Sequence, residues 1–265
     1  DGWGVAYYEE GDVFLLREPS PAAESDLVRF MEVNGPPSSL VLSHIRLATL
    51  GELALRNTQP FQRELGGRVH VFAHNGNMPG VTEACRLRTD RFTPVGETDS
   101  EFAFCCLLER LGELWDGGNG KVPPVEARLD VVAELAASLR SLGPFNFVYA
   151  DGDALFVHAH IRKQDDGIER PPGLHLLVRS SNEEAVDLTE SGVILAPLAQ
   201  ELALVASVPL TDDEPWEPIA QGEVIALKQG VVWARSGTDN VRGSQVCIPA
   251  DSGEGQAVYS EPEFA

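Results

Sequence analysis

Long apolar runs, cysteines and basic side chains are all scarce in this chain of 265 residues. No stretch approaches the length of about 18 uninterrupted apolar residues that reads as a transmembrane helix, so we expect no membrane span. The four cysteines show no metal-ligand spacing, and two of them are adjacent. So few cysteines in so long a chain argue against a disulfide framework and predict a reducing, cytoplasmic setting.

The charge balance excludes two kinds of partner. Acidic residues number 41 against 20 basic ones, which gives a formal net charge of −21. Nucleic acids and anionic membranes are both bound through clustered Lys and Arg, so we expect neither as a partner. The same acidity is ordinary for a soluble surface or a salty habitat, and it does not identify a function.

Apolar periodicity predicts strands in both halves of the chain and two long helices between them. Strands are expected over 3–8, 12–16, 39–48 and 69–73, and again over 145–150, 154–161, 174–179, 202–208 and 223–234. Helices are expected over 24–33, from 98 to about 115 and over 125–139, and residues 56–65 are expected to be irregular. Helices segregated from antiparallel strands indicate α+β layers. We expect one domain over 1–236 and a loosely attached tail over 237–265.

Three short motifs carry polar groups at the ends of predicted elements. SHIRLAT at 43–49 places Arg46 at a strand end, where its guanidinium could hold a carboxylate or make an ordinary surface salt bridge. AHNGN at 73–77 ends a strand at Asn75 and Gly76, which could form either a hairpin turn or an oxyanion hole. GETDSE at 96–101 fits a capping box, in which Thr98 and Glu101 cap a helix and Asp99 could also capture an ammonium group.

The three motifs say more together than apart. A site for a free α-amino acid needs a cation for the carboxylate and an anion for the ammonium group, and amide hydrolysis also needs oxyanion donors. Arg46 supplies the cation, Asp99 the anion, and Asn75 with Gly76 the donors.

An ordered set of motifs then resembles the class II glutamine amidotransferases, and within them the stand-alone, YafJ-like bacterial branch. The matching segments are DGWG at 1–4, HIRLAT at 44–49, NTQPF at 57–61, HNG at 74–76, TDSE at 98–101 and FNF at 145–147. The resemblance covers roughly residues 1–235. It implies an N-terminal-nucleophile fold, a four-layer αββα sandwich of two antiparallel sheets between helical layers.

The resemblance also implies roles for the matched residues. Arg46 would hold the glutamine α-carboxylate with help from Thr49, and Asp99 would hold the α-amino group. Asn75 and Gly76 would stabilise the oxyanion. The substrate-binding residues implied in this way are Arg46, Thr49, His74 and Asp99.

The nucleophile of this family is a cysteine at the first position of the mature chain, whose own α-amino group is the base. We expect it in a segment before Asp1, because Cys85, Cys105, Cys106 and Cys247 have no free α-amino group. The other explanation is that the protein has lost the cysteine and only binds. Where relatives often carry His, this sequence carries Gln59. A glutamine side chain does not titrate, so we expect it to form hydrogen bonds and not to transfer protons.

Three functions follow as hypotheses. The first is hydrolysis of the glutamine side-chain amide to glutamate and ammonia for a separate synthetase. The second is hydrolysis of a γ-glutamyl amide in a small-metabolite pathway, and the third is a non-catalytic glutamine-binding regulatory module.

We expect no metal or organic cofactor. His158 and His160 alternate along a predicted strand, as residues on one face of a hairpin do. The sequence does not identify the ammonia acceptor.

Overall fold

The computed structural model describes residues 1–47, 51–118, 120–180, 187–188, 193–194 and 201–236. Its helices are α1 (Asp26–Asn34), α2 (Val81–Ala84), α3 (Asp99–Asp116) and α4 (Val125–Leu139). The longer strands are β1 (Trp3–Glu9), β2 (Asp12–Glu18), β3 (Val41–Ile45), β4 (Phe61–Leu65), β5 (Arg68–Gly76), β6 (Phe145–Ala150), β7 (Leu155–His158), β10 (His175–Arg179), β13 (Leu202–Ala206), β15 (Val224–Lys228) and β16 (Val231–Ser236). Two-residue strands are β8 (Arg162–Lys163), β9 (Glu169–Arg170), β11 (Asp187–Leu188), β12 (Val193–Ile194) and β14 (Glu217–Pro218).

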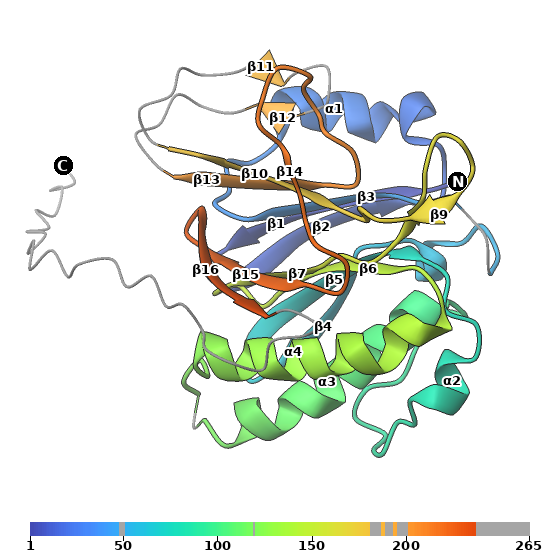
Figure 1. The fold of residues 1–265 in the computed structure, drawn as a ribbon, viewed down its shortest axis with the longest axis vertical. Coiled ribbons are helices and arrows are strands. Elements are labelled where there is room, and N and C mark those ends of the chain that lie inside the picture. Colours follow the sequence, from blue (N-terminus) through green and yellow to red (C-terminus); the bar gives the residue numbers. More distant parts are fainter. Residues whose placement is uncertain (48–50, 119, 181–186, 189–192, 195–200, 237–265) are drawn as a thin grey trace, which may run out of the picture.

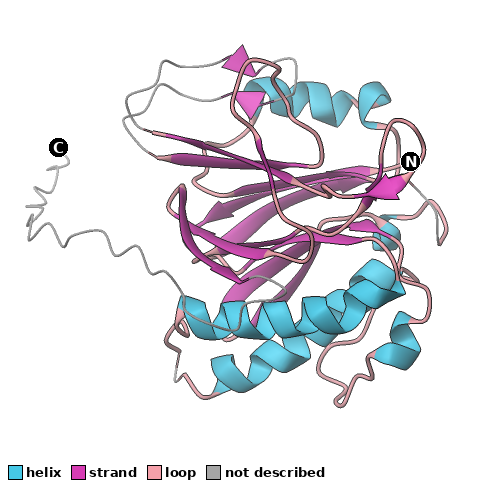
Figure 2. Cartoon of the chain, viewed as in Figure 1, coloured by secondary structure: helices cyan, strands magenta, loops and turns pink. Residues whose placement is uncertain are grey.

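The strands form two antiparallel layers between helices (Figures 1 and 2). One layer is a six-stranded sheet in the order β16-β15-β7-β6-β5-β4. The other consists of two three-stranded sheets, β2-β1-β3 and β13-β10-β14. Helices α3 and α4 cover the free face of the six-stranded sheet, and α1 lies beyond the other strands (Figure 1). The predicted α+β sandwich of four layers is therefore confirmed.

Strand β6 shows how the layers are held together. Its residues alternate between two faces, so Phe145, Phe147 and Tyr149 join the core under α3 and α4. Val148 and Ala150 point the other way and join the apolar contacts to the three-stranded sheets. The six-stranded sheet is therefore buried on both faces, which explains why its central strands are almost continuously apolar.

Helix α3 begins largely as the sequence predicts. The Thr98 hydroxyl accepts a hydrogen bond from the Glu101 amide at 3.2 Å, the first half of a capping box. The reciprocal half was predicted wrongly, because the Glu101 carboxylate accepts instead from the amides of Val95 and Gly96. It also forms a salt bridge with Arg63. The carboxylate thus ties the preceding loop to the helix.

The prediction of an irregular segment over 56–65 was wrong at its end. Residues 61–65 form strand β4, which pairs with β5 at the edge of the six-stranded sheet. Phe61 and Leu65 are buried, and between them Arg63 reaches inward to Glu101. Because Arg63 occupies the middle one of the three inward positions, the segment lacks the alternation of apolar and polar residues by which a strand is predicted from sequence.

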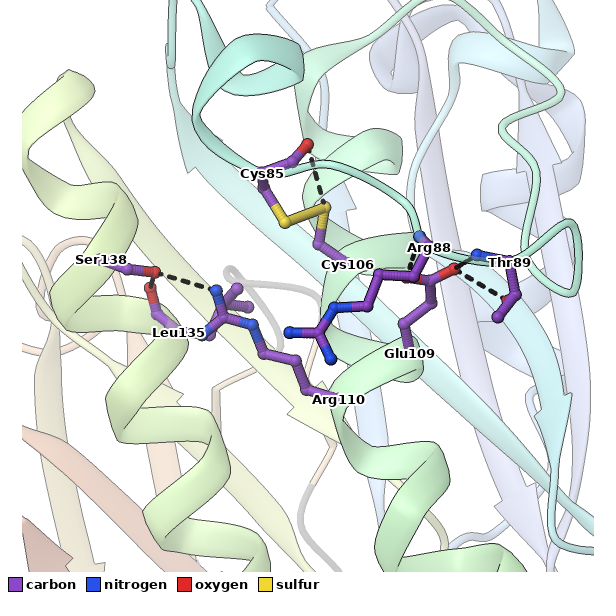
Figure 3. Close-up of a disulfide and its surroundings, with 8 residues drawn as sticks. All are labelled: Cys85, Arg88, Thr89, Cys106, Glu109, Arg110, Leu135 and Ser138. Carbon is purple, nitrogen blue, oxygen red and sulfur yellow. Dashed lines mark hydrogen bonds between the residues drawn. A yellow bond between two sulfur atoms is a disulfide. The ribbon is translucent and has the colours of Figure 1, made fainter.

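One disulfide is present, although the few cysteines argued against a disulfide framework. Cys85, just after α2, is bonded to Cys106 on α3 (Figure 3). The two residues are 21 positions apart and meet because the chain folds back from α2 along α3. Cys105 is free and buried, as expected for helix core. The cytoplasmic location stays a prediction, and this bond counts against the reasoning behind it, because disulfides persist mainly in oxidising compartments.

Candidate active site

Arg46 follows the last residue of β3, and a turn of main chain surrounds its side chain. Its amide donates to the Gly2 carbonyl at 2.8 Å. Its guanidinium donates to the carbonyls of Glu52 at 3.1 Å and Gly51 at 3.4 Å. Arg46 is 5% exposed, and burial lowers the pKa of its guanidinium, although arginine stays charged in proteins. A fixed cation therefore lies at the end of β3. The Thr49 predicted to assist it lies outside the described residues.

Asn75 and Gly76 are the last two residues of β5. No hairpin follows them, since β5 pairs with β4 and with the distant β6. Gly76 has φ +155°, and a Cβ atom there would lie 1.8 Å from the carbonyl oxygen of Pro144, so only glycine fits. The exposed Asn75 side chain donates to the Ser207 hydroxyl at 3.4 Å. The turn alternative is excluded, and the Asn75 amide is accessible to a ligand.

The main chain of Asn75 is held by Asn146 from the neighbouring strand β6. The buried Asn146 amide donates to the carbonyls of Asn75 at 3.1 Å and Ile161 at 2.7 Å. Its side-chain oxygen accepts from the His160 amide at 2.7 Å. Sequence reasoning matched Asn146 to the family but assigned it no role.

Asp99 is the first residue of α3, and its carboxylate binds the main chain just after Asn75 and Gly76. Its Oδ2 accepts from the Met78 amide at 2.6 Å, and its Oδ1 accepts from the Ser100 amide at 2.8 Å. Met78 lies only two residues beyond Gly76. The carboxylate therefore combines helix capping with a position close to the end of β5, so the two interpretations of Asp99 are compatible.

His74 lies beneath this surface rather than on it. The ring is 2% exposed, with Nδ1 2.9 Å from the Ser100 hydroxyl and Nε2 3.4 Å from the Pro144 carbonyl oxygen. Burial lowers the pKa of His74, and the charge of Asp99 opposes that shift. A contribution of His74 to substrate binding would therefore be indirect, through Ser100 and Asp99.

Gln59 makes the hydrogen bonds predicted for it. Its side chain accepts from the His74 amide at 2.6 Å and donates to the His74 carbonyl at 3.1 Å. The His44 ring also contacts that carbonyl oxygen, at 3.1 Å. The Gln59 side chain therefore bonds to the main chain of β5 as a residue of a neighbouring strand would, and it fixes β5 two residues before Gly76.

The described residues thus present a cation, an anion and amide donors, a combination suited to an α-amino acid with a side-chain amide. Within this part of the chain, no group of three or more His, Cys, Asp and Glu residues could hold a metal ion. Nor is any described helix both long and apolar enough to cross a membrane.

Comparison with known proteins decides the family. A family model described as class II glutamine amidotransferases matches residues 1–250. The chain belongs to this family. It is 34% identical over 228 residues to the Escherichia coli K12 protein named "Putative glutamine amidotransferase YafJ", with 84% of this chain and 83% of that protein covered.

Two solved structures are similar to this chain, the first at a sequence identity above 30%. A crystal structure described as a predicted glutamine amidotransferase from Pseudomonas aeruginosa PA01 is 31% identical, with a TM-score of 0.66 and coverage of 88% of this chain and 86% of that one. The allosteric regulatory enzyme of purine biosynthesis is 14% identical, with a TM-score of 0.54, and this chain covers 43% of it. That second likeness shows the fold alone.

Proposed function

We propose that this amidotransferase domain hydrolyses the side-chain amide of glutamine to glutamate and ammonia, and supplies the ammonia to a separate synthetase. The observation that carries the proposal is the contact between the Asp99 carboxylate and the Met78 amide. It brings the group suited to an α-ammonium beside the end of β5, where Asn75 and Gly76 offer donors for an oxyanion. Arg46 supplies the charge for the α-carboxylate.

In the proposed reaction a thiolate attacks the amide carbon, and the negative charge on the oxygen is stabilised by the side-chain amide of Asn75 and the backbone N–H of Gly76. The α-amino group of the nucleophile has taken the proton of the thiol, and it now gives that proton to the leaving nitrogen. The C–N bond breaks and ammonia leaves. Water then cleaves the γ-glutamyl thioester, which regenerates the thiol and releases glutamate.

The proposal places the nucleophile on a cysteine before Asp1, as the family resemblance implies. The described cysteines support this choice. Cys85 and Cys106 are bonded to each other. Cys105 is buried in α3, and burial raises the pKa of its thiol to about 11, so it would rarely be a thiolate at neutral pH.

Binding of L-glutamine to Arg46→Ala and Asp99→Ala variants of the intact protein tests the site. Each change should weaken binding at least about tenfold, because a hydrogen bond to a charged group contributes roughly 1.5–3 kcal/mol. Arg29→Ala and Asp26→Ala are matched controls, since they remove the same two charges from a solvent-exposed pair on α1. Calorimetry that finds near-normal affinity in either site variant would overturn the assignment.

Release of ammonia from glutamine by the intact protein separates the hypotheses. Turnover supports the amidotransferase, whereas tight glutamine binding without turnover would support the regulatory module. Faster turnover of a γ-glutamyl amide than of glutamine would support the alternative hydrolase.

A further inference from the structure

Asn57 is a buried side chain that joins two loops of the site. It is 0% exposed and lies in the NTQPF segment, before β4. Its Nδ2 donates to the Glu52 carbonyl at 3.1 Å, and its Oδ1 accepts from the Glu97 amide at 2.9 Å. One amide group therefore connects the turn after β3 to the loop before α3.

Each end of this connection leads directly to a charged group of the proposed site. The Glu52 carbonyl that accepts from Asn57 also accepts from the Arg46 guanidinium at 3.1 Å. At the other end, Glu97 is two residues before Asp99. The chain of contacts from Arg46 to the start of α3 therefore passes through Asn57.

The main chain of both loops packs so closely against Asn57 that a residue with a Cβ atom would collide with it at Gly51 and at Gly96. A Cβ atom at Gly51, where φ is +74°, would lie 2.7 Å from Asn57 Nδ2. A Cβ atom at Gly96 would lie 2.3 Å from Asn57 Oδ1. Two glycines thus let the main chain reach the two ends of one side-chain amide, which fixes the separation of the loops.

We propose that Asn57 is a specificity-determining residue that sets the spacing between the Arg46 guanidinium and the Asp99 carboxylate, so that the site selects ligands carrying both a free α-carboxylate and a free α-ammonium group. The inference rests on the proposed function of those two residues. Both groups sit on one carbon of an amino acid, so their separation is fixed, and a misplacement of about 1 Å at a binding site is costly.

Binding of three ligands to the intact protein tests the role: L-glutamine, 4-carbamoylbutanoate and 4-aminobutanamide. The second ligand lacks the α-ammonium group of glutamine and the third lacks its α-carboxylate. Asn57→Ala should weaken glutamine binding at least about tenfold, the equivalent of one well-placed hydrogen bond. It should weaken binding of each one-ended ligand less than about twofold, because a ligand that contacts only one charge does not sense the spacing.

Arg56→Ala is the matched control. Arg56 is adjacent and bridges the carboxylates of Glu52 and Glu97, but it is 38% exposed, and such surface pairs contribute little. It should change none of the three affinities by more than about twofold. Asn57→Asp is a second variant that keeps the size and the acceptor for the Glu97 amide but loses the donor to Glu52, so it should show the same selective loss of glutamine.

The outcomes separate the two proposals. An equal loss for all three ligands in both Asn57 variants would show a merely structural role and overturn the inference, while leaving the proposed function intact. Unchanged glutamine affinity in both variants would overturn it as well. If the unaltered protein binds no glutamine, the proposed function fails and the inference fails with it.

Discussion

The buried ring of His158 makes a quantitative prediction about acid stability. His158 is 0% exposed and packs between Phe145 and Phe147, with ring centroids 5.6 Å and 5.2 Å away. Burial is the main reason that its pKa is lowered from 6.5 to about 3, and the neighbouring charges of His160, Arg140 and His74 also lower it. The folded protein therefore keeps this ring neutral where an unfolded chain would protonate it.

The sign of the effect follows from this difference. A depressed pKa in the folded state gives stability that is full above about pH 6.5 and is lost as the pH falls towards 3. One pKa unit is equivalent to about 1.36 kcal/mol, so this ring alone should cost about 2 kcal/mol between pH 7 and pH 5.

Urea denaturation of the unaltered protein and of His158→Phe at pH 7 and pH 5 tests this value. Phenylalanine fills similar space among the aromatic rings and cannot be protonated. The unaltered protein should lose about 2 kcal/mol more of its free energy of unfolding than the variant does between the two pH values. Other buried histidines contribute equally to both proteins and cancel. Equal losses in the two proteins would refute the reasoning.

Two further perturbations test the core and the disulfide. Arg128 is 1% exposed and pairs with the fully buried Asp151, so Arg128→Met should lower the free energy of unfolding by about 3–5 kcal/mol; a loss below about 1 kcal/mol in urea denaturation would contradict this. The Cys85–Cys106 bond closes a loop with a sequence separation of 21, which in the chain-entropy model corresponds to about 3 kcal/mol. Dithiothreitol should lower the urea midpoint of the unaltered protein but not that of Cys85→Ser, and identical shifts would argue against the bond.

The sequence predicted the elements whose signals are local. The β1–β2 hairpin, the start of α3 at Thr98 and the end of β5 at Gly76 all depend on a few neighbouring residues, and the structure has each of them. Arg46 and Asp99 were identified as candidates because each is charged and follows or begins a predicted element.

What the sequence did not reveal depends on contacts between distant segments. Asn57 and Asn146 are ordinary polar residues by type, and their importance lies in backbone partners that only the fold brings near. The Cys85–Cys106 bond was missed for the same reason, since nothing in the spacing of the two residues indicates that α2 lies along α3.

Strand β6 ties the integrity of the site to the completeness of folding. Its alternate residues belong to the two cores on either side of the six-stranded sheet, and Asn146 between them holds the main chain of Asn75. A slip of one residue in β6 would exchange its faces and remove that support together with both sets of core contacts. Partly folded states in which only one of the two cores has formed should therefore lack the support that Asn146 gives to the main chain of Asn75.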